Sequence, residues 1–196
     1  MNPNTLRRTA AAALAVVAMG AASGVAYASM GAMGHEQTKT VGGAPMYPSR
    51  NIIQNAVNSK DHTTLVTAVK AAGLVDTLQS PGPFTVFAPT NAAFAKLPAG
   101  AVNTLLEPQN KDKLAAVLGY HVVAGRLTAS ELIAQVKAGG GHATLKTVQG
   151  EPLTVTASGA RITLTDAKGR ASHVTIGDVL QSNGVIHVVD TVLLPG

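Results

Sequence analysis

The sequence has no cysteine and no tryptophan, and these two absences exclude several kinds of site. Without cysteine the chain forms no disulfide, thiolate metal site, cysteine nucleophile or lipid-modified N-terminal cysteine. Aromatic residues make up only 3% of the chain, which argues against sugar-stacking clefts, aromatic cages and the stacking platforms of single-stranded nucleic-acid binding. The chain is 46% hydrophobic, so its core must consist mainly of Ala, Val, Leu and Ile.

The motifs of common enzymes are also missing. There is no G-x-S-x-G nucleophile elbow and no G-x-x-x-x-G-K phosphate loop. His35-Glu36 begins like a zinc-protease motif, but Lys39 stands where the second His is required. The glycines at 139–141 end a predicted helix, whereas a phosphate-binding loop needs glycines that open one. We therefore expect no enzyme activity and no cofactor.

The N-terminal residues have the features of an export signal. Arg7 and Arg8 precede an apolar run at 10–19, and 26–28 is a small-x-small cleavage site. The run is too short to cross a bilayer core of about 30 Å, so no membrane insertion is expected. Residues 1–28 are therefore predicted to be a signal peptide for general secretion, which delivers the chain to the periplasm or the extracellular space.

The charge balance of the mature chain is ordinary. Cleavage after Ala28 removes two arginines and takes the formal net charge from +5 to +3. No run rich in Lys and Arg follows, so no nucleic-acid partner is expected.

Residues 29–48 are predicted to be a flexible tail, because the segment has Gly, Pro and polar residues with no helix or strand period. Met30, Met33, His35 and Met46 lie in this tail, and thioether and imidazole groups suit copper. Copper binding is therefore one alternative function. Carriage of a small ligand in a pocket between helices and sheet is another.

From Ser49 onward the hydrophobic period becomes helical, and in the last third it changes to two. Helices are predicted near 52–57, from an Asp61 N-cap to Gly73, over 110–119 and from a Thr128–Glu131 capping box to 139. Strands are predicted at 84–88, 120–123, 153–155, 161–165, 173–176, 185–189 and 191–194. The order predicts one α+β domain over 49–196, a wedge of short helices packed against a mostly antiparallel β-sheet.

Three motifs in this domain carry a family resemblance. Residues 84–94 read FTVFAPTNAAF, Tyr120-His121 follows, and residues 183–195 read NGVIHVVDTVLLP. These resemble, in the same order, the first signature, the Tyr-His pair and the second signature of the fasciclin (FAS1) domain. The match extends from about Pro48 to Pro195, and it is most similar to bacterial secreted single-domain members, including the major secreted antigens of mycobacteria.

The resemblance implies a fold of helices packed on a β-sandwich-like sheet, in agreement with the periodicity. It also implies adhesion without chemistry, with a protein or polysaccharide partner at a cell surface or in a matrix. In animal members the Tyr-His region and an Asp-Ile pair contribute to recognition. The matching positions here are Tyr120, His121, Asp178 and Val179, with Val in place of Ile.

Each motif residue also has a structural interpretation. His121 is expected to be a buried imidazole bonded to a backbone carbonyl or to the Thr90-Asn91 turn, and His187 is expected in the core. Asp178 either caps a turn or presents its carboxylate, and the three phenylalanines are expected to form one dense part of the core. The family-motif residues are Thr90, Asn91, Phe94, Asn183, Gly184, His187 and Asp190.

Overall fold

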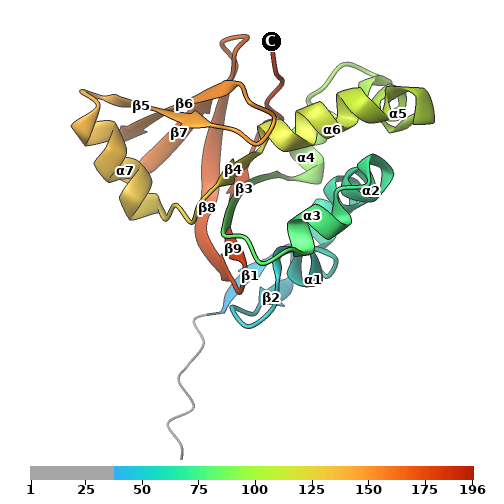
Figure 1. The fold of residues 1–196 in the computed structure, drawn as a ribbon, viewed down its shortest axis with the longest axis horizontal. Helices are drawn as coiled ribbons and strands as arrows, with labels where there is room; N and C mark the ends of the chain where they lie inside the picture. The colour runs from blue at the N-terminus through green and yellow to red at the C-terminus, as the bar shows by residue number, and fades with distance from the viewer. Residues whose placement is uncertain (1–37) are drawn as a thin grey trace, which may run out of the picture. The chain divides into compact units, whose positions relative to one another are not determined.

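The computed structural model describes residues 38–196 (Figure 1), and the structural statements below concern these residues. The predicted signal peptide, together with Met30, Met33 and His35, lies outside the described residues. Within 38–196, no helix combines the length and the apolar character needed to cross a membrane.

The described chain alternates short helices with strands and ends in a β-meander. The helices are α1 (Ile52–Ala56), η1 (Lys60–His62), α2 (Thr63–Ala72), α3 (Val75–Gln79), α4 (Asn91–Ala95), α5 (Ala101–Leu106), η2 (Pro108–Asn110), α6 (Lys111–Tyr120) and α7 (Ala129–Ala138). The strands are β1 (Lys39–Val41), β2 (Ala44–Met46), β3 (Phe84–Pro89), β4 (Val122–Ala124), β5 (His142–Lys146), β6 (Pro152–Ser158), β7 (Arg161–Thr165), β8 (Ala171–Gln181) and β9 (Gly184–Val189).

One sheet of seven strands organises these elements, in the order β4-β3-β9-β8-β7-β6-β5. Only β3 and β9 pair in parallel, from Phe84 opposite Gly184 to Pro89 opposite Val189, and the other neighbours are antiparallel. A bridge between Val123 and Thr147 joins β4 to the segment after β5. The predicted α+β class with a mostly antiparallel sheet is confirmed.

The core consists of two clusters. The helix-side cluster gathers side chains of the N-terminal helices and of β3 and β9, among them Ile52, Leu65, Val69, Val86, Phe94 and Ile186. The α7-side cluster lies where α7 packs on β5, β6 and β7 (Figure 1), and it includes Phe87, Leu132, Leu153, Val155, Ile162 and Leu164. Phe87 and Phe94 belong to different clusters, so the expectation of one phenylalanine-rich core was wrong. Phe87 is in a strand and Phe94 in the following helix, and the two side chains face different layers.

The predicted tail ends earlier than expected, because residues 39–46 form a β-hairpin of the folded domain. β1 and β2 pair antiparallel around Gly42 and Gly43, both at positive φ. Val41 is 4% exposed and Met46 is 3% exposed, and both belong to the helix-side cluster. The prediction of a tail over 29–48 was therefore wrong for this segment, and Met46 packs in the core rather than joining a copper site.

Two further local predictions were wrong. Asp61 does not cap a helix, because Lys60–His62 form a 3-10 turn and α2 begins at Thr63. The amide oxygen of Asn91 instead accepts a hydrogen bond of 3.0 Å from the Thr64 N–H, so the cap of α2 comes from another element. Residues 191–194 are not a strand, because the chain leaves the sheet after Val189.

Replacing Met46 by Ala tests whether the hairpin belongs to the folded domain. We expect Met46→Ala to lower the free energy of unfolding by roughly 2–5 kcal/mol, because it leaves a cavity in the core. Urea unfolding measures this loss. Thr40→Ala in the same hairpin removes an exposed side chain and should change stability little. Equal, small effects of both substitutions would restore the tail interpretation.

Candidate functional site

Tyr120 ends α6, and its side chain is buried inside the domain at 0% exposure. The hydroxyl donates to the Pro152 carbonyl at 2.9 Å and accepts from the Ala167 N–H at 3.1 Å. Burial is the main cause that raises the pKa of this phenol. The hydroxyl thus ties the end of α6 to the first residue of β6 and to the β7–β8 turn.

His121 follows at the C-cap of α6 and is 2% exposed. Nδ1 donates to the Val117 carbonyl at 2.8 Å, because Nε2 is occupied as the acceptor of the Leu193 N–H at 3.0 Å. Burial lowers the pKa of His121 to about 4, with the Val117 carbonyl and Asp166 acting in the opposite direction. The imidazole is therefore neutral at pH 7, and the predicted bond to a backbone carbonyl is confirmed.

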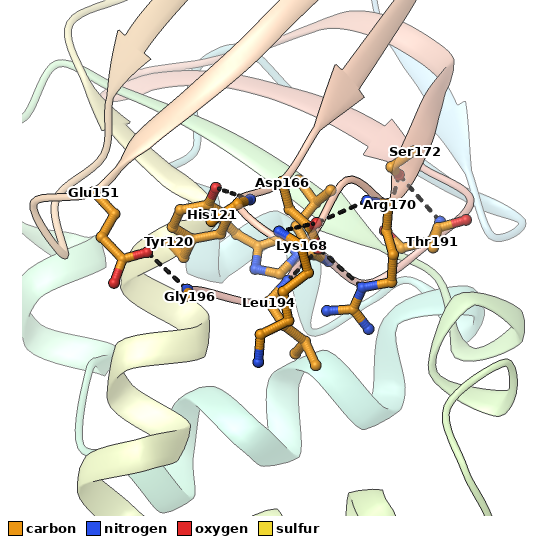
Figure 2. Close-up of polar contacts among 12 residues, drawn as sticks. Tyr120, His121, Glu151, Asp166, Lys168, Arg170, Ser172, Thr191, Leu194 and Gly196 are labelled. Atoms are coloured by element: carbon orange, nitrogen blue, oxygen red, sulfur yellow. Dashed lines mark hydrogen bonds and ion pairs between the residues drawn. The ribbon is translucent and has the colours of Figure 1, made fainter.

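The C-terminal strap, residues 192–196, is held by three side-chain acceptors (Figure 2). Leu193 donates to His121, Leu194 donates to Asp166 Oδ2 at 3.0 Å, and Gly196 donates to Glu151 Oε2 at 2.8 Å. Because these N–H groups belong to no strand or helix, the acceptors replace the partners that secondary structure would supply.

Asp166 is the central anchor of this strap. Its side chain is 0% exposed and its oxygens accept from the Lys168 and Arg170 N–H groups, from Arg170 Nε at 3.0 Å and from the strap. Burial acts to raise the pKa of Asp166, but these hydrogen bonds and the Arg170 charge outweigh it and lower the pKa. No pattern in the sequence signalled that the Asp166 carboxylate is buried.

Asp178 lies in a bulge of β8, where the pairing with β9 shifts register between Ile176 and Val179. It has a φ of +53°, and its Oδ1 accepts from the Ala129 N–H at 2.7 Å. Ala129 is the first residue of α7, so Asp178 supplies an acceptor and a negative charge to that helix end. The Asp178 carboxylate therefore bonds to the start of a helix rather than capping a turn of its own. Val179, beside it, is 1% exposed.

His187 connects this bulge to the core. Nδ1 accepts from the Asp178 N–H at 3.3 Å, and Nε2 donates to the Leu127 carbonyl at 2.8 Å. The ring stacks on Phe87 with centroids 5.7 Å apart. Burial is the main cause that lowers the pKa of His187. The predicted core position of His187 is confirmed.

The structure does not bring Tyr120-His121 and Asp178-Val179 into one site. No hydrogen bond within residues 38–196 joins the two pairs, and Phe87 lies between them. Its N–H donates to the His121 carbonyl at 2.8 Å, while its ring stacks on His187. Tyr120, His121 and Val179 are all buried, so their side chains are not available for direct contact with a partner in this conformation. Asp178 is partly exposed.

The first signature holds helices in place. Thr90 caps α4 by accepting from the Ala93 N–H at 3.2 Å. Asn91 accepts from Thr64 and donates to the Lys60 carbonyl at 2.9 Å, which fixes the start of α2. Phe94 is 6% exposed and packs in the helix-side cluster.

The second signature holds α1 and β3 in place. Asn183 accepts from the Ile52 N–H at 3.0 Å and donates to the carbonyls of Leu78 and Ser80. Only glycine fits at position 184, because a Cβ there would overlap the Phe84 carbonyl oxygen. Asp190 accepts from the His173 N–H at 2.9 Å and lies 3.9 Å from Lys96 Nζ.

Comparisons with known proteins agree with this architecture. The fasciclin-domain family profile matches residues 60–195. The chain belongs to the fasciclin domain family. It is 46% identical over 162 residues to Protein sll1483 of Synechocystis, which covers 82% of this chain and 82% of that protein. It is 37% identical over 145 residues to Immunogenic protein MPB70 of Mycobacterium bovis, covering 71% of this chain and 66% of the relative.

A solved fasciclin structure has the same fold. The FAS1 domain pair of the insect cell adhesion molecule fasciclin I superposes with a TM-score of 0.68 at 20% identity, over 76% of this chain and 52% of that chain. Residues 38–196 contain no group of three or more His, Asp or Glu side chains that could hold a metal ion.

Because His121 is neutral in the fold, we expect the free energy of unfolding to depend on pH. Its pKa is near 4 in the fold and ordinary, near 6.5, in the unfolded chain, so the unfolded state binds more protons between these values. The free energy of unfolding is therefore unaffected by His121 above pH 6.5, and it falls by about 3 kcal/mol as the pH drops to 4 and below.

Urea unfolding of the wild type and of His121→Gln at several pH values isolates this effect, and the wild type should lose more stability on acidification. His142→Gln, at an exposed position, is the matched control. In the folded wild type, imidazole nitrogen NMR shifts should show His121 neutral at pH 5. A protonated His121 at that pH contradicts the prediction.

Removing the Asp166 charge should release the C-terminal strap. We expect Asp166→Asn to cost about 3 kcal/mol of folding free energy, because Arg170 loses its buried partner. Hydrogen exchange at the Leu194 N–H should become faster, whereas the exposed Asp76→Asn should change neither quantity. Unchanged exchange at Leu194 would show that Asp166 does not hold the strap.

Proposed function

We propose that this chain is a non-catalytic adhesion module that is exported and binds a protein or polysaccharide at a cell surface or in a matrix. The observation that carries the proposal is the family membership over residues 60–195. The structural neighbour described as part of a cell adhesion molecule supports the same class of function. The sequence features of a signal peptide at 1–28 support export to the periplasm or the extracellular space.

The bulge surface is the place we assign to the partner. We define it as Thr175 and Asp178 of β8, Ser130 at the start of α7, and Lys39 of β1. Thr175 and Ser130 are exposed, and Asp178 and Lys39 are partly exposed. Asp178 is fixed by Ala129 and His187, and Lys39 Nζ donates to the Gly177 carbonyl at 2.5 Å. A surface held in this way loses little conformational entropy when a partner binds.

Tyr120 and His121 take part in this proposal as positioning residues. They hold the C-terminal strap and the end of α6, and the His121 carbonyl holds β3 at Phe87. Phe87 stacks on His187, which bonds to the Asp178 N–H. Their effect on a partner is therefore transmitted through β3 and β9 rather than made by direct contact.

Blocking the bulge surface tests the proposal. The purified 29–196 chain is applied to immobilised collagen, fibronectin, whole cells and envelope polysaccharide at low and high salt. We expect saturable, salt-tolerant binding to at least one of them. Thr175→Arg/Ser130→Arg should weaken it at least about tenfold, because two bulky side chains then cover the surface.

Thr144→Arg/Ala134→Arg is the matched control, with the same added charge at exposed positions of β5 and α7. Thermal melting first shows that both variants are folded. An equal loss of binding in both variants would mean that the added charge, and not its position, weakens binding, and it would contradict the bulge surface. Binding unaffected by either would keep adhesion and contradict the bulge surface, and no binding by the wild type to any probe would contradict adhesion.

A further inference from the structure

The outer face of β5, β6 and β7 carries a regular array of threonines. The α7-side cluster takes the inward residues of these strands, such as Leu145, Leu153 and Leu164, and α7 packs on the same strands. Because side chains alternate along a strand, the residues between these point to the opposite face. We call that face the threonine face and define it as Thr144, Thr154, Thr156, Thr163 and Thr165, with Lys146 and Arg161 beyond them.

The strand register places the five threonines in two rows. Thr144 lies opposite Thr154, which lies opposite Thr165. Thr156 lies opposite Thr163 in the next row. Neighbouring strands are about 4.8 Å apart, and successive outward residues of one strand are about 7 Å apart. The spacing across the strands is therefore close to the length of one sugar unit in an extended polysaccharide.

The hydroxyls of the threonine face are available to a ligand. All five threonines are exposed or partly exposed, and within residues 38–196 none of their hydroxyls takes part in a hydrogen bond. Thr85 differs, because its hydroxyl donates to the Gly125 carbonyl at 2.7 Å inside the fold. A hydroxyl both donates and accepts, so the five free ones match the hydroxyl groups of a sugar in either direction.

The fixed charges of the threonine face have one sign. Lys146 and Arg161 are exposed and lie at opposite ends of the face, about 20 Å apart along the strands. β5, β6 and β7 contain no Asp or Glu. Asp190 borders the face at β8, where its Oδ2 lies 3.4 Å from His173 Nδ1. The face is therefore complementary to an anionic ligand.

The ratio of hydroxyls to cations narrows the kind of anion. Five hydroxyls accompany two fixed cations, which fits a chain whose units each carry one carboxylate and several hydroxyls. Nucleic acid carries a phosphate on every unit, and its bases are bound by stacking on aromatic side chains. β5, β6 and β7 contain no aromatic residue, so the observations favour a polysaccharide.

We infer that the threonine face binds an acidic polysaccharide built of uronic acid units. The threonine hydroxyls pair with sugar hydroxyls, and Lys146 and Arg161 pair with carboxylates near the two ends of the face. A sheet holds these groups in place, so binding costs little conformational entropy. The threonine face shares no residue with the bulge surface, and the inference does not depend on adhesion through that surface.

Titration of the purified 29–196 chain with oligogalacturonate tests the inference. The fully methyl-esterified oligosaccharide is the matched neutral probe, and oligothymidylate is a polyanion that lacks the sugar hydroxyls. We expect saturable binding of oligogalacturonate at least about tenfold tighter than of either comparison probe, because only it offers both charges and hydroxyls. High salt should weaken the binding, since exposed charges are screened.

Amide NMR shifts in the wild type locate the ligand without any substitution. We expect oligogalacturonate to move the signals of Thr144, Thr154 and Thr163 along one binding curve. The signal of Ser130, in the bulge surface, should stay in place.

Two double variants separate the hydroxyls from the charges. Thr154→Val/Thr163→Val removes two hydroxyls, keeps the branched shape that strands favour, and should weaken oligogalacturonate binding about tenfold. Lys146→Ser/Arg161→Ser should weaken it about fivefold and reduce its salt dependence. Thr144→Arg adds a cation to the face and should tighten the binding.

Matched controls carry the same changes at exposed positions elsewhere. Thr40→Val/Thr77→Val lies on β1 and α3, Lys70→Ser/Lys111→Ser lies on α2 and α6, and both should bind like the wild type. Thermal melting first shows that every variant is folded.

Several results would overturn the inference. They are the absence of saturable oligogalacturonate binding, equal affinity for the methyl ester, and equal effects of the variants and their controls. Oligothymidylate binding of equal strength would show attraction to any polyanion and would contradict the inference as well. Amide shifts confined to the bulge surface would place the ligand there and contradict the threonine face.

Discussion

The parallel pairing of β3 with β9 is the contact on which the rest of the structure depends. It joins the first signature to the second at the centre of the sheet, from Phe84 opposite Gly184 to Pro89 opposite Val189. The strands approach so closely that a Cβ at Gly184 would meet the Phe84 carbonyl. Both core clusters are built on these two strands, since Val86 and Ile186 belong to one and Phe87 and Val189 to the other. The N-terminal helices pack directly on these two strands, whereas α7 packs on β5, β6 and β7 of the same sheet.

Buried neutral imidazoles then connect this centre to segments that lack partners of their own. His121 accepts an N–H of the C-terminal strap, and His187 joins the β8 bulge to the loop before α7. Each uses one ring nitrogen as donor and the other as acceptor, so burial leaves no polar atom unpaired. The same arrangement makes protonation costly, because a charged ring would turn the acceptor nitrogen into a second donor facing an N–H. His62 shares the burial but lacks the second partner.

Local signals in the sequence predicted local structure well. The Thr128–Glu131 capping box and the helix end at Gly73 need only a few neighbouring residues, and both are present. The features that sequence reasoning missed depend on distant partners. The hairpin at 39–46 is too short for its period to stand out and is stabilised by the core it covers. Likewise, the cap that Asn91 gives to α2 and the burial of Asp166 arise only once the chain is folded.

This distinction also limits what the motifs say about function. Tyr120, His121, Val179, Asn183 and His187 are buried, and their hydrogen bonds or packing serve the fold. A motif built of such residues identifies the domain, because those side chains satisfy constraints that every copy of the fold meets. The bulge surface proposed for a partner includes, in contrast, exposed positions such as Thr175 and Ser130. Shared signatures therefore establish a common scaffold, and under the proposed function the choice of partner would rest on residues that the signatures do not contain.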